Sequence, residues 1–144
     1  MDSNSFYQVY FNCELETKEE VYSFISEMVC QDPSQKEEVV NQFNQREKVG
    51  STLIAEHVML PHIESNLIKK SQILFIRLAN PIQSWDVQTK DIRLLIVLLL
   101  KENEDVQIKK KIASFTRTLA DEQYVNRLLT INEKESFYKE IRKN

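Results

Sequence analysis

Glycine is almost absent from this sequence: of its 144 residues, only Gly50 is a glycine. The phosphate-binding loops of P-loop and dinucleotide-binding proteins need at least two glycines, because the backbone must approach the phosphate closely. The G-x-S-x-G turn that presents the nucleophilic serine of an α/β-hydrolase needs two as well. The sequence therefore excludes all three kinds of site.

A surplus of positive charge is also missing. The chain carries 19 Lys and Arg against 22 Asp and Glu, which gives a formal net charge of −3. Proteins that bind nucleic acid normally carry a basic surplus, because much of their affinity comes from contacts with phosphates. We therefore expect no nucleic-acid binding by this domain.

No apolar run is long enough to span a bilayer. The longest uninterrupted one, Leu94–Leu100, is far shorter than the roughly 20 residues that a membrane-spanning helix needs. The first residues show no basic segment followed by an apolar one, so no secretory signal is visible. The two cysteines, Cys13 and Cys30, make no disulfide framework in a chain of this length. We expect a cytoplasmic protein with reduced thiols and no membrane insertion.

The residue pattern predicts one layered domain. No internal repeat or flexible linker divides the chain, so we treat residues 1–144 as a single domain. Aromatic and β-branched residues predict a strand over 6–13, and apolar runs predict strands over 73–78 and 92–100. The last run is continuously apolar from Leu94 to Leu100, as expected for a central strand covered on both faces. Helical spacing before and after these strands completes an α/β pattern.

Short capping patterns predict where three helices begin. The patterns start at Thr17, Ser34 and Asn132, and each places a Glu three residues later, as in a capping box. The pair Asp32-Pro33 is expected to end the first helix, because proline cannot continue the hydrogen-bond ladder.

The sequence has two histidines, His57 and His62, five positions apart. This spacing puts them about 140° apart on a helix and on opposite faces of a strand. It is not the spacing of paired metal ligands on one face, so we predict no metal site. A single histidine can still act as a nucleophile, because neutral imidazole keeps a lone pair on one nitrogen.

Arg46 is the candidate cation beside such a histidine. It continues the apolar stripe of its helix, three residues after Phe43 and seven after Val39. An unpaired guanidinium in that position is costly to bury, and its planar donors suit an anion such as a phosphoryl group. The alternative, which periodicity alone favours, is a salt bridge from Arg46 to Glu47 or another carboxylate.

The segment from residue 45 to residue 62 resembles the enzyme IIA domains of the fructose/mannitol class (type 2) of the bacterial sugar phosphotransferase system. The matching residues are Arg46-Glu47, Ser51-Thr52 and Leu60-Pro61-His62. The arginine and the histidine are sixteen positions apart, as in the family. Glu56, six positions before the histidine, also matches some members.

The resemblance implies both a fold and a role. The fold is a central mixed β-sheet with helices packed on both sides. The role is that of a phosphocarrier, which takes a phosphoryl group from the phosphohistidine of HPr onto His62 and passes it to a cysteine of a IIB domain. Arg46 would steady the phosphate, Glu56 would orient the imidazole by accepting its other N–H, and Thr52 would line the pocket. This transfer needs no nucleotide, metal or other cofactor.

A regulatory module is the alternative role. IIA-like domains also occur in transcriptional regulators and antiterminators, where phosphorylation of the histidine is a signal. Some family members carry a second histidine near the start of the long C-terminal helix, but residues 106–111 contain none. That absence favours the regulatory role, whereas Arg46, Glu56 and His62 together favour the carrier. A third possibility is a protein-binding domain that is not phosphorylated.

Overall fold

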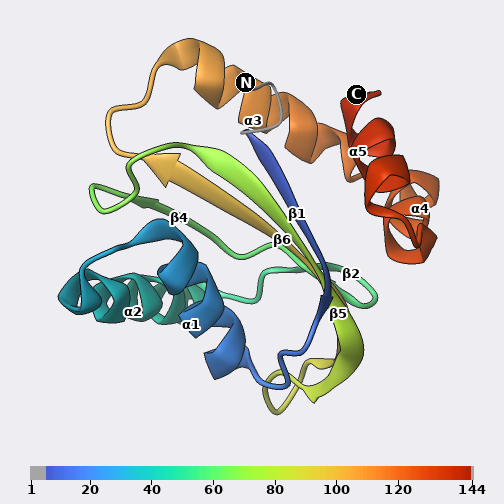
Figure 1. The fold of residues 1–144 in the computed structure, drawn as a ribbon, viewed down its shortest axis with the longest axis horizontal. Helices are drawn as coiled ribbons and strands as arrows, with labels where there is room; N and C mark the ends of the chain where they lie inside the picture. Colours follow the sequence, from blue (N-terminus) through green and yellow to red (C-terminus); the bar gives the residue numbers. More distant parts are fainter. Residues whose placement is uncertain (1–5, 144) are drawn as a thin grey trace.

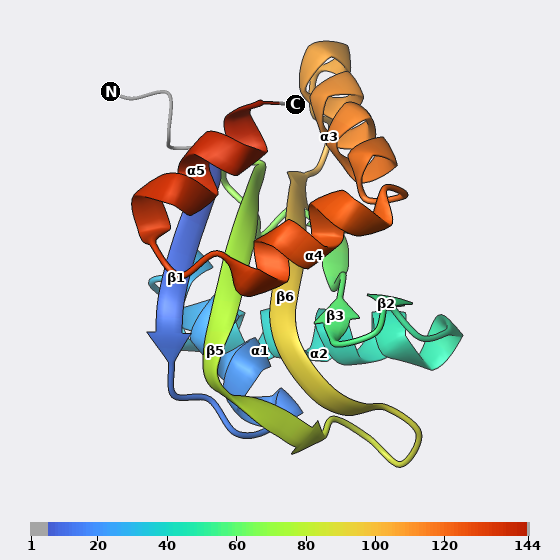
Figure 2. The same cartoon turned by 90° about the vertical axis from the view of Figure 1, so that its right-hand side faces the viewer.

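The computed structural model describes residues 6–143, which form a six-stranded sheet between two layers of helices (Figures 1 and 2). In chain order the elements are β1 (Tyr7–Cys13), α1 (Lys18–Val29), α2 (Pro33–Val49), β2 (Leu53–Ala55), β3 (Val58–Met59), β4 (His62–Ser65), β5 (Gln72–Ser84), β6 (Lys90–Lys101), α3 (Val106–Thr118), α4 (Glu122–Thr130) and α5 (Lys134–Arg142). One face of the sheet packs against α1 and α2, and the other against α3, α4 and α5. The predicted α/β architecture, a central sheet with helices on both sides, is confirmed.

The sheet is mixed, as the resemblance implied. Its strand order is β1-β5-β6-β3-β2, and β4 also pairs with β6. β5 and β6 form an antiparallel pair. β1 lies parallel to β5, β3 and β4 lie parallel to β6, and β2 runs antiparallel to β3.

Alternate side chains of β6 enter two separate cores. The core under α1 and α2 receives Leu95, Val97 and Leu99, and the core under α3–α5 receives Leu94, Ile96 and Leu98. Successive side chains of a strand point to opposite faces, so a strand covered on both faces must be apolar throughout. The predicted burial of this strand on both faces is confirmed.

Side-chain caps fix where the first two helices begin. Thr17 caps α1 as predicted, because its hydroxyl accepts a backbone N–H of the first turn at 3.1 Å. The predictions at Ser34 and Asn132 are wrong. Asp32 caps α2, and Pro33 begins it, since the fixed φ of proline suits the first helical position. This pair therefore starts α2 rather than ending α1, and α5 begins without a side-chain cap.

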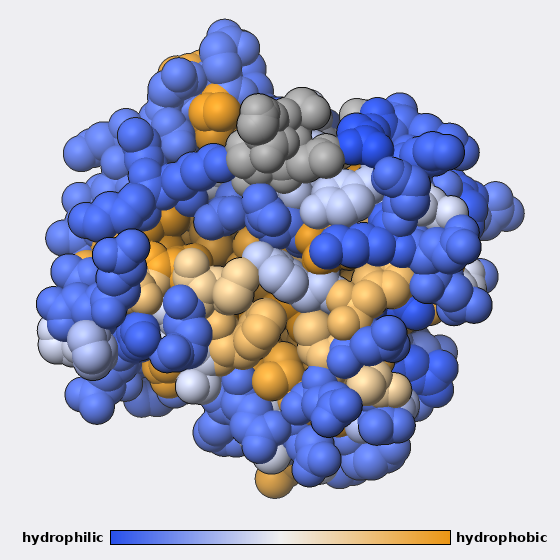
Figure 3. All heavy atoms as spheres, in the orientation of Figure 1, coloured by the Kyte–Doolittle hydropathy of each residue, from blue (hydrophilic) through white to orange (hydrophobic). Residues whose placement is uncertain are grey.

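Polar residues cover most of the face seen in Figure 3, and hydrophobic side chains reach the surface in its middle, between the two helical layers. Within residues 6–143 no helix is both long enough and apolar enough to cross a membrane.

Arg77 joins the sheet to the C-terminal end of α4. From β5, its guanidinium donates to the carbonyls of Leu128 at 3.0 Å and Ile131 at 2.6 Å, and it lies 5.0 Å from the centre of the Phe11 ring. The last carbonyls of a helix have no partner within the helix, and a cation there also complements the helix dipole. Burial lowers the pKa of Arg77, although a guanidinium keeps its proton in proteins.

Replacing Arg77 with methionine should lower the free energy of unfolding by about 2 kcal/mol, because two carbonyls lose a charged donor. Urea denaturation would measure the change. Arg117 is exposed on α3, and Arg117→Met should change stability by no more than about 0.5 kcal/mol. Equal stability of the two variants would contradict a stabilising role for Arg77.

Candidate functional site

His62 is the first residue of β4. It lies opposite Leu98 in the parallel pairing with β6, and the N–H of Leu98 donates to the carbonyl of Pro61 at 3.0 Å. Proline has no N–H to pair and favours extended backbone in the residue before it, so the chain enters β4 without a further turn. The side chain of His62 is half-buried.

The two ring nitrogens of His62 face different kinds of partner. Nδ1 lies 3.0 Å from the carbonyl oxygen of Leu60, and Nε2 lies 3.1 Å from Nε of Arg46. A carbonyl can only accept a hydrogen bond, and a guanidinium can only donate. The partners therefore assign the proton to Nδ1 and leave the lone pair of the imidazole on Nε2.

Arg46 reaches this histidine from the last turn of α2. Its Nε–H donates to Nε2 of His62, and its Nη1 donates to the carbonyl oxygen of Gly50 at 3.0 Å. A guanidinium has five N–H donors. Further donors therefore remain for an anion placed beside the imidazole.

The alternative salt bridge from Arg46 to Glu47 is not formed. The Glu47 carboxylate instead accepts hydrogen bonds from the hydroxyl of Tyr22 and, at 3.4 Å, from Nε1 of Trp85, and lies 3.5 Å from Nζ of Lys18. Among the described residues, no carboxylate pairs with Arg46. The charge of Arg46 is thus directed at His62 without a neutralising partner.

Thr52 lies next to the segment that holds His62. Its backbone carbonyl accepts the N–H of Leu60 at 2.8 Å, and the carbonyl of Leu60 faces Nδ1 of His62. The Thr52 side chain is buried, with 5% of the residue exposed, and its hydroxyl has no hydrogen-bond partner within residues 6–143. An unpaired buried hydroxyl is unfavourable by roughly 1–3 kcal/mol.

Glu56 does not have the expected role beside His62. It lies in the turn between β2 and β3, with 88% of its side chain exposed, and its carboxylate is 3.9 Å from Nε2 of His57. The hairpin brings Thr52 and Leu60 together at its base and carries Glu56 away to its tip. The position opposite Nδ1, predicted for Glu56, is taken by the Leu60 carbonyl.

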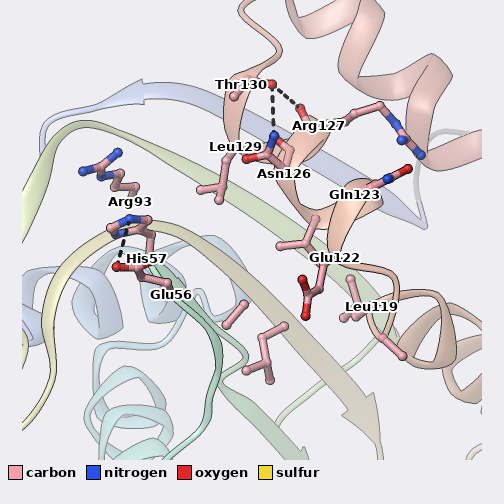
Figure 4. A pocket seen from close by; sticks show the side chains of 14 residues that line it. Glu56, His57, Arg93, Leu119, Glu122, Gln123, Asn126, Arg127, Leu129 and Thr130 are labelled. Carbon is pink, nitrogen blue, oxygen red and sulfur yellow. Dashed lines mark hydrogen bonds and ion pairs between the residues drawn. The ribbon is translucent and has the colours of Figure 1, made fainter.

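His57 belongs to a different part of the molecule. Its Nδ1 lies 2.9 Å from the carbonyl oxygen of Asp91 and 3.4 Å from the carboxylate of the same residue. Hydrogen bonds from Arg93 hold the pKa of Asp91 below its ordinary value. His57 and Arg93 line an open groove of about 1070 Å³, whose other wall comes from α4 (Figure 4). His62 and Arg46 do not line this groove.

The structure thus brings Arg46 to His62, joins the Thr52 backbone to Leu60 in the adjoining segment, and carries Glu56 away from His62. In the described part of the chain, no group of three or more His, Cys, Asp or Glu side chains is arranged to hold a metal ion. Two backbone carbonyls also take part: that of Leu60 faces Nδ1 of His62, and that of Gly50 accepts a hydrogen bond from Arg46. A backbone carbonyl has no side-chain signature, so no sequence pattern could have predicted them.

Comparison with known proteins identifies relatives of this chain. Residues 6–144 match the family described as "Phosphoenolpyruvate-dependent sugar phosphotransferase system, EIIA 2". The chain is also 30% identical over 115 residues to the mannitol-specific EIICBA component of Klebsiella pneumoniae. This alignment covers 78% of the chain but only 18% of that much longer protein.

Two solved structures have a similar fold. Nitrogen regulatory protein IIA-Ntr from Neisseria meningitidis aligns with a TM-score of 0.75 and 18% identity, over 96% of this chain and 97% of that one. Enzyme IIA of mannitol from Escherichia coli, in its complex with phosphorylated enzyme IIB, aligns with a TM-score of 0.70 and 21% identity, over 100% and 98%. At these identities the likeness shows the fold alone. The family match over residues 6–144 goes further, and the chain belongs to the type 2 EIIA family of the phosphoenolpyruvate-dependent sugar phosphotransferase system.

Proposed function

We propose that this chain is a phosphocarrier domain, which accepts a phosphoryl group on Nε2 of His62 from the phosphohistidine of HPr and passes it to a cysteine of a IIB domain. The observation that carries this proposal is the hydrogen bond of 3.1 Å between Nε of Arg46 and Nε2 of His62. It selects the nitrogen that holds the lone pair, and it puts a permanent positive charge beside that nitrogen.

The transfer itself is a substitution at phosphorus. The lone pair of Nε2 forms the new P–N bond while the P–N bond of the donor histidine breaks, and the donor imidazole keeps that electron pair. Nδ1 retains its proton throughout, and its contact with the Leu60 carbonyl stabilises the positive charge that develops on the ring. Passage onward to a thiolate breaks the P–N bond of His62 and forms a P–S bond, which restores the free imidazole.

Arg46 has to move for this reaction to occur. Its Nε–H occupies the lone pair that attacks phosphorus, so that hydrogen bond must break before the new bond forms. The contact of Nη1 with the Gly50 carbonyl keeps the guanidinium close, where it donates to the equatorial phosphoryl oxygens. Positive charge at those oxygens stabilises the transition state.

Thr52 is the third component of this proposed site. Its buried hydroxyl lacks a partner among the described residues. Its backbone carbonyl accepts a hydrogen bond from Leu60, whose own carbonyl faces His62. A phosphoryl oxygen would give the hydroxyl the acceptor that it lacks. The expected role of Glu56 is not retained, because Leu60 faces Nδ1 instead.

Protein partners would dock around the histidine. Val49, three residues after Arg46, is 82% exposed, and Leu53, which follows Thr52, is exposed as well. Exposed apolar side chains close to a reactive group suit a surface that another protein covers. The mannitol relative solved with phosphorylated enzyme IIB supports a IIB partner for this chain.

A regulatory module is the second candidate, because residues 106–111 contain no second histidine and the fold resembles a nitrogen regulatory protein. In that role the phosphoryl group stays on His62 as a signal. Chasing the labelled protein with a IIB domain separates the two candidates. Rapid loss of label to the IIB cysteine supports the carrier, and retention of the label supports the regulator.

Incubation with enzyme I, HPr and phosphoenolpyruvate should give one acid-labile phosphoryl group per chain. His62→Asn should abolish the label, because it removes the lone pair that attacks phosphorus. His57→Asn is the matched control and should be labelled as the wild type is. Asparagine is chosen because it tolerates the positive φ of 76° at residue 57. Label that persists on His62→Asn would refute His62 as the acceptor.

Arg46→Ala should slow this labelling by at least about tenfold, because the transition state loses its charge clamp. Quenched-flow measurement of the initial rate with phospho-HPr would test it. Lys48 occupies the same last turn of α2, and Lys48→Ala should leave the rate within about twofold of wild type. An unchanged rate for Arg46→Ala would remove Arg46 from the mechanism.

Thr52→Val should slow labelling by about tenfold through the loss of one donor. The same substitution should not destabilise the fold, because it replaces an unpaired hydroxyl with a methyl group. Rate measurements together with thermal unfolding would test both effects. Thr52→Ser retains the hydroxyl and should label at nearly the wild-type rate. If valine labels as fast as serine, the hydroxyl has no part in the transfer.

A further inference from the structure

Glu47 follows Arg46 in the chain but contacts a different set of residues. Only 13% of its side chain is exposed. Its carboxylate accepts hydrogen bonds from the Tyr22 hydroxyl of α1 and from Nε1 of Trp85, which directly follows β5, and it forms an ion pair with Lys18 at the start of α1. One carboxylate thus joins the end of α2 to α1 and to the connection between β5 and β6.

The two aromatic donors are fixed by close packing. The ring of Tyr22 stacks on Phe43 of α2 with centroids 4.8 Å apart, and it meets Trp85 edge to face at 5.6 Å. Tyr22 and Trp85 are both buried. Burial and the hydrogen bond to Glu47 raise the pKa of Tyr22 well above its ordinary value, so its hydroxyl keeps the proton that it donates. The two donors are held in place by packing, so rotation of the end of α2 would break their hydrogen bonds to Glu47.

Fixing Glu47 also fixes the direction of Arg46. Successive residues of an α-helix point about 100° apart, so a helix end whose Glu47 is held by α1 directs Arg46 to one side. The last turn of a helix is otherwise the part that frays. In addition to the hydrogen bonds within the helix, the N–H of Gly50 donates to the carbonyl of Glu47 at 3.2 Å and closes this turn.

We propose that Glu47 is a positioning residue, which holds the last turn of α2 so that the Arg46 guanidinium meets Nε2 of His62. This inference rests on the proposed phosphoryl transfer at His62. Arg46 leaves Nε2 during that transfer and must return to the same place. The attachment of Glu47 to α1 and Trp85 keeps the helix end stationary while the neighbouring side chain moves.

Labelling rates test whether Glu47 acts through Arg46. Glu47→Gln should slow labelling by phospho-HPr by about tenfold, because a misplaced clamp loses most of its effect. In the Arg46→Ala background, the same change should slow labelling by less than about twofold, because coupled residues are not additive. Equal slowing in both backgrounds, or none in the first, would overturn the proposal.

Glu27→Gln is the matched control. Glu27 also links α1 to α2, through an ion pair of 2.8 Å with Lys36, but it is far more exposed than Glu47. The substitution Glu27→Gln removes an interhelical ion pair but leaves the neighbours of Arg46 unchanged, so the labelling rate should not change. Slowing by Glu27→Gln equal to that by Glu47→Gln would assign the effect to helix packing in general.

A second readout does not depend on phosphorylation. In the unlabelled protein, the NMR signal of the Arg46 Nε–H reports its hydrogen bond to His62. Glu47→Gln should accelerate exchange of this proton with water at least about tenfold, and Glu27→Gln should leave it unchanged. Unchanged exchange in Glu47→Gln would overturn the proposal. Tyr22→Phe, which removes one donor but leaves the carboxylate, should accelerate exchange too, and it replaces Glu47→Gln if that variant does not fold.

The two proposals fail in different ways. A wild-type chain that takes no label from phospho-HPr overturns the proposed function, and the exchange measurement then still decides whether Glu47 holds Arg46 on His62. A wild-type chain that is labelled, with Glu47→Gln equal to it in rate and in exchange, overturns the positioning role alone.

Discussion

A single hydrogen bond between Arg46 and His62 connects the end of a helix to the beginning of a strand. It forms only if α2 ends at the right residue and β4 pairs with β6 in the right register. A shift of one residue in that pairing would send the imidazole to the opposite face of the sheet. Gly50 and the short hairpin of β2 and β3 return the chain from one element to the other. The surrounding fold can therefore be understood as the frame that keeps these two groups in contact.

Much of this frame is visible in the sequence, because local patterns determine it. The burial of β6 on both faces follows from its uninterrupted apolar run, and the cap at Thr17 follows from a hydroxyl at a helix start. The length of β5 does not. The sequence predicts a strand over 73–78, but β5 runs on to Ser84, because pairing with β6 resumes after an irregularity. Pairing with a neighbouring strand overrides local preference there, and no local pattern reports it.

In the candidate site, too, some contacts could be predicted from the sequence and others depend on how distant segments fold together. The resemblance to the type 2 EIIA family pairs Arg46 with His62, and the structure brings the two side chains into contact. Glu56 is nearer to His62 in sequence than Arg46 is, yet the hairpin carries it to the tip, beside His57. Its place is taken by the carbonyl of Leu60. In a hairpin, residues that are close in sequence can lie far apart in space. Contacts made by backbone carbonyls leave no pattern in the amino-acid sequence.

The contact between the guanidinium and Nε2 of His62 has a consequence for the idle protein. Imidazole nitrogens readily capture transition-metal ions and alkylating agents, and both need the same electron pair. In the idle state that pair is already shielded by a cation, which repels metal ions and hinders electrophiles. In the proposed transfer, the negative oxygens of an arriving phosphoryl group would attract the guanidinium away from the ring. The Arg46 guanidinium thus limits the access of metal ions and electrophiles to Nε2 of His62, and under the proposed function it would release that nitrogen to an anionic group.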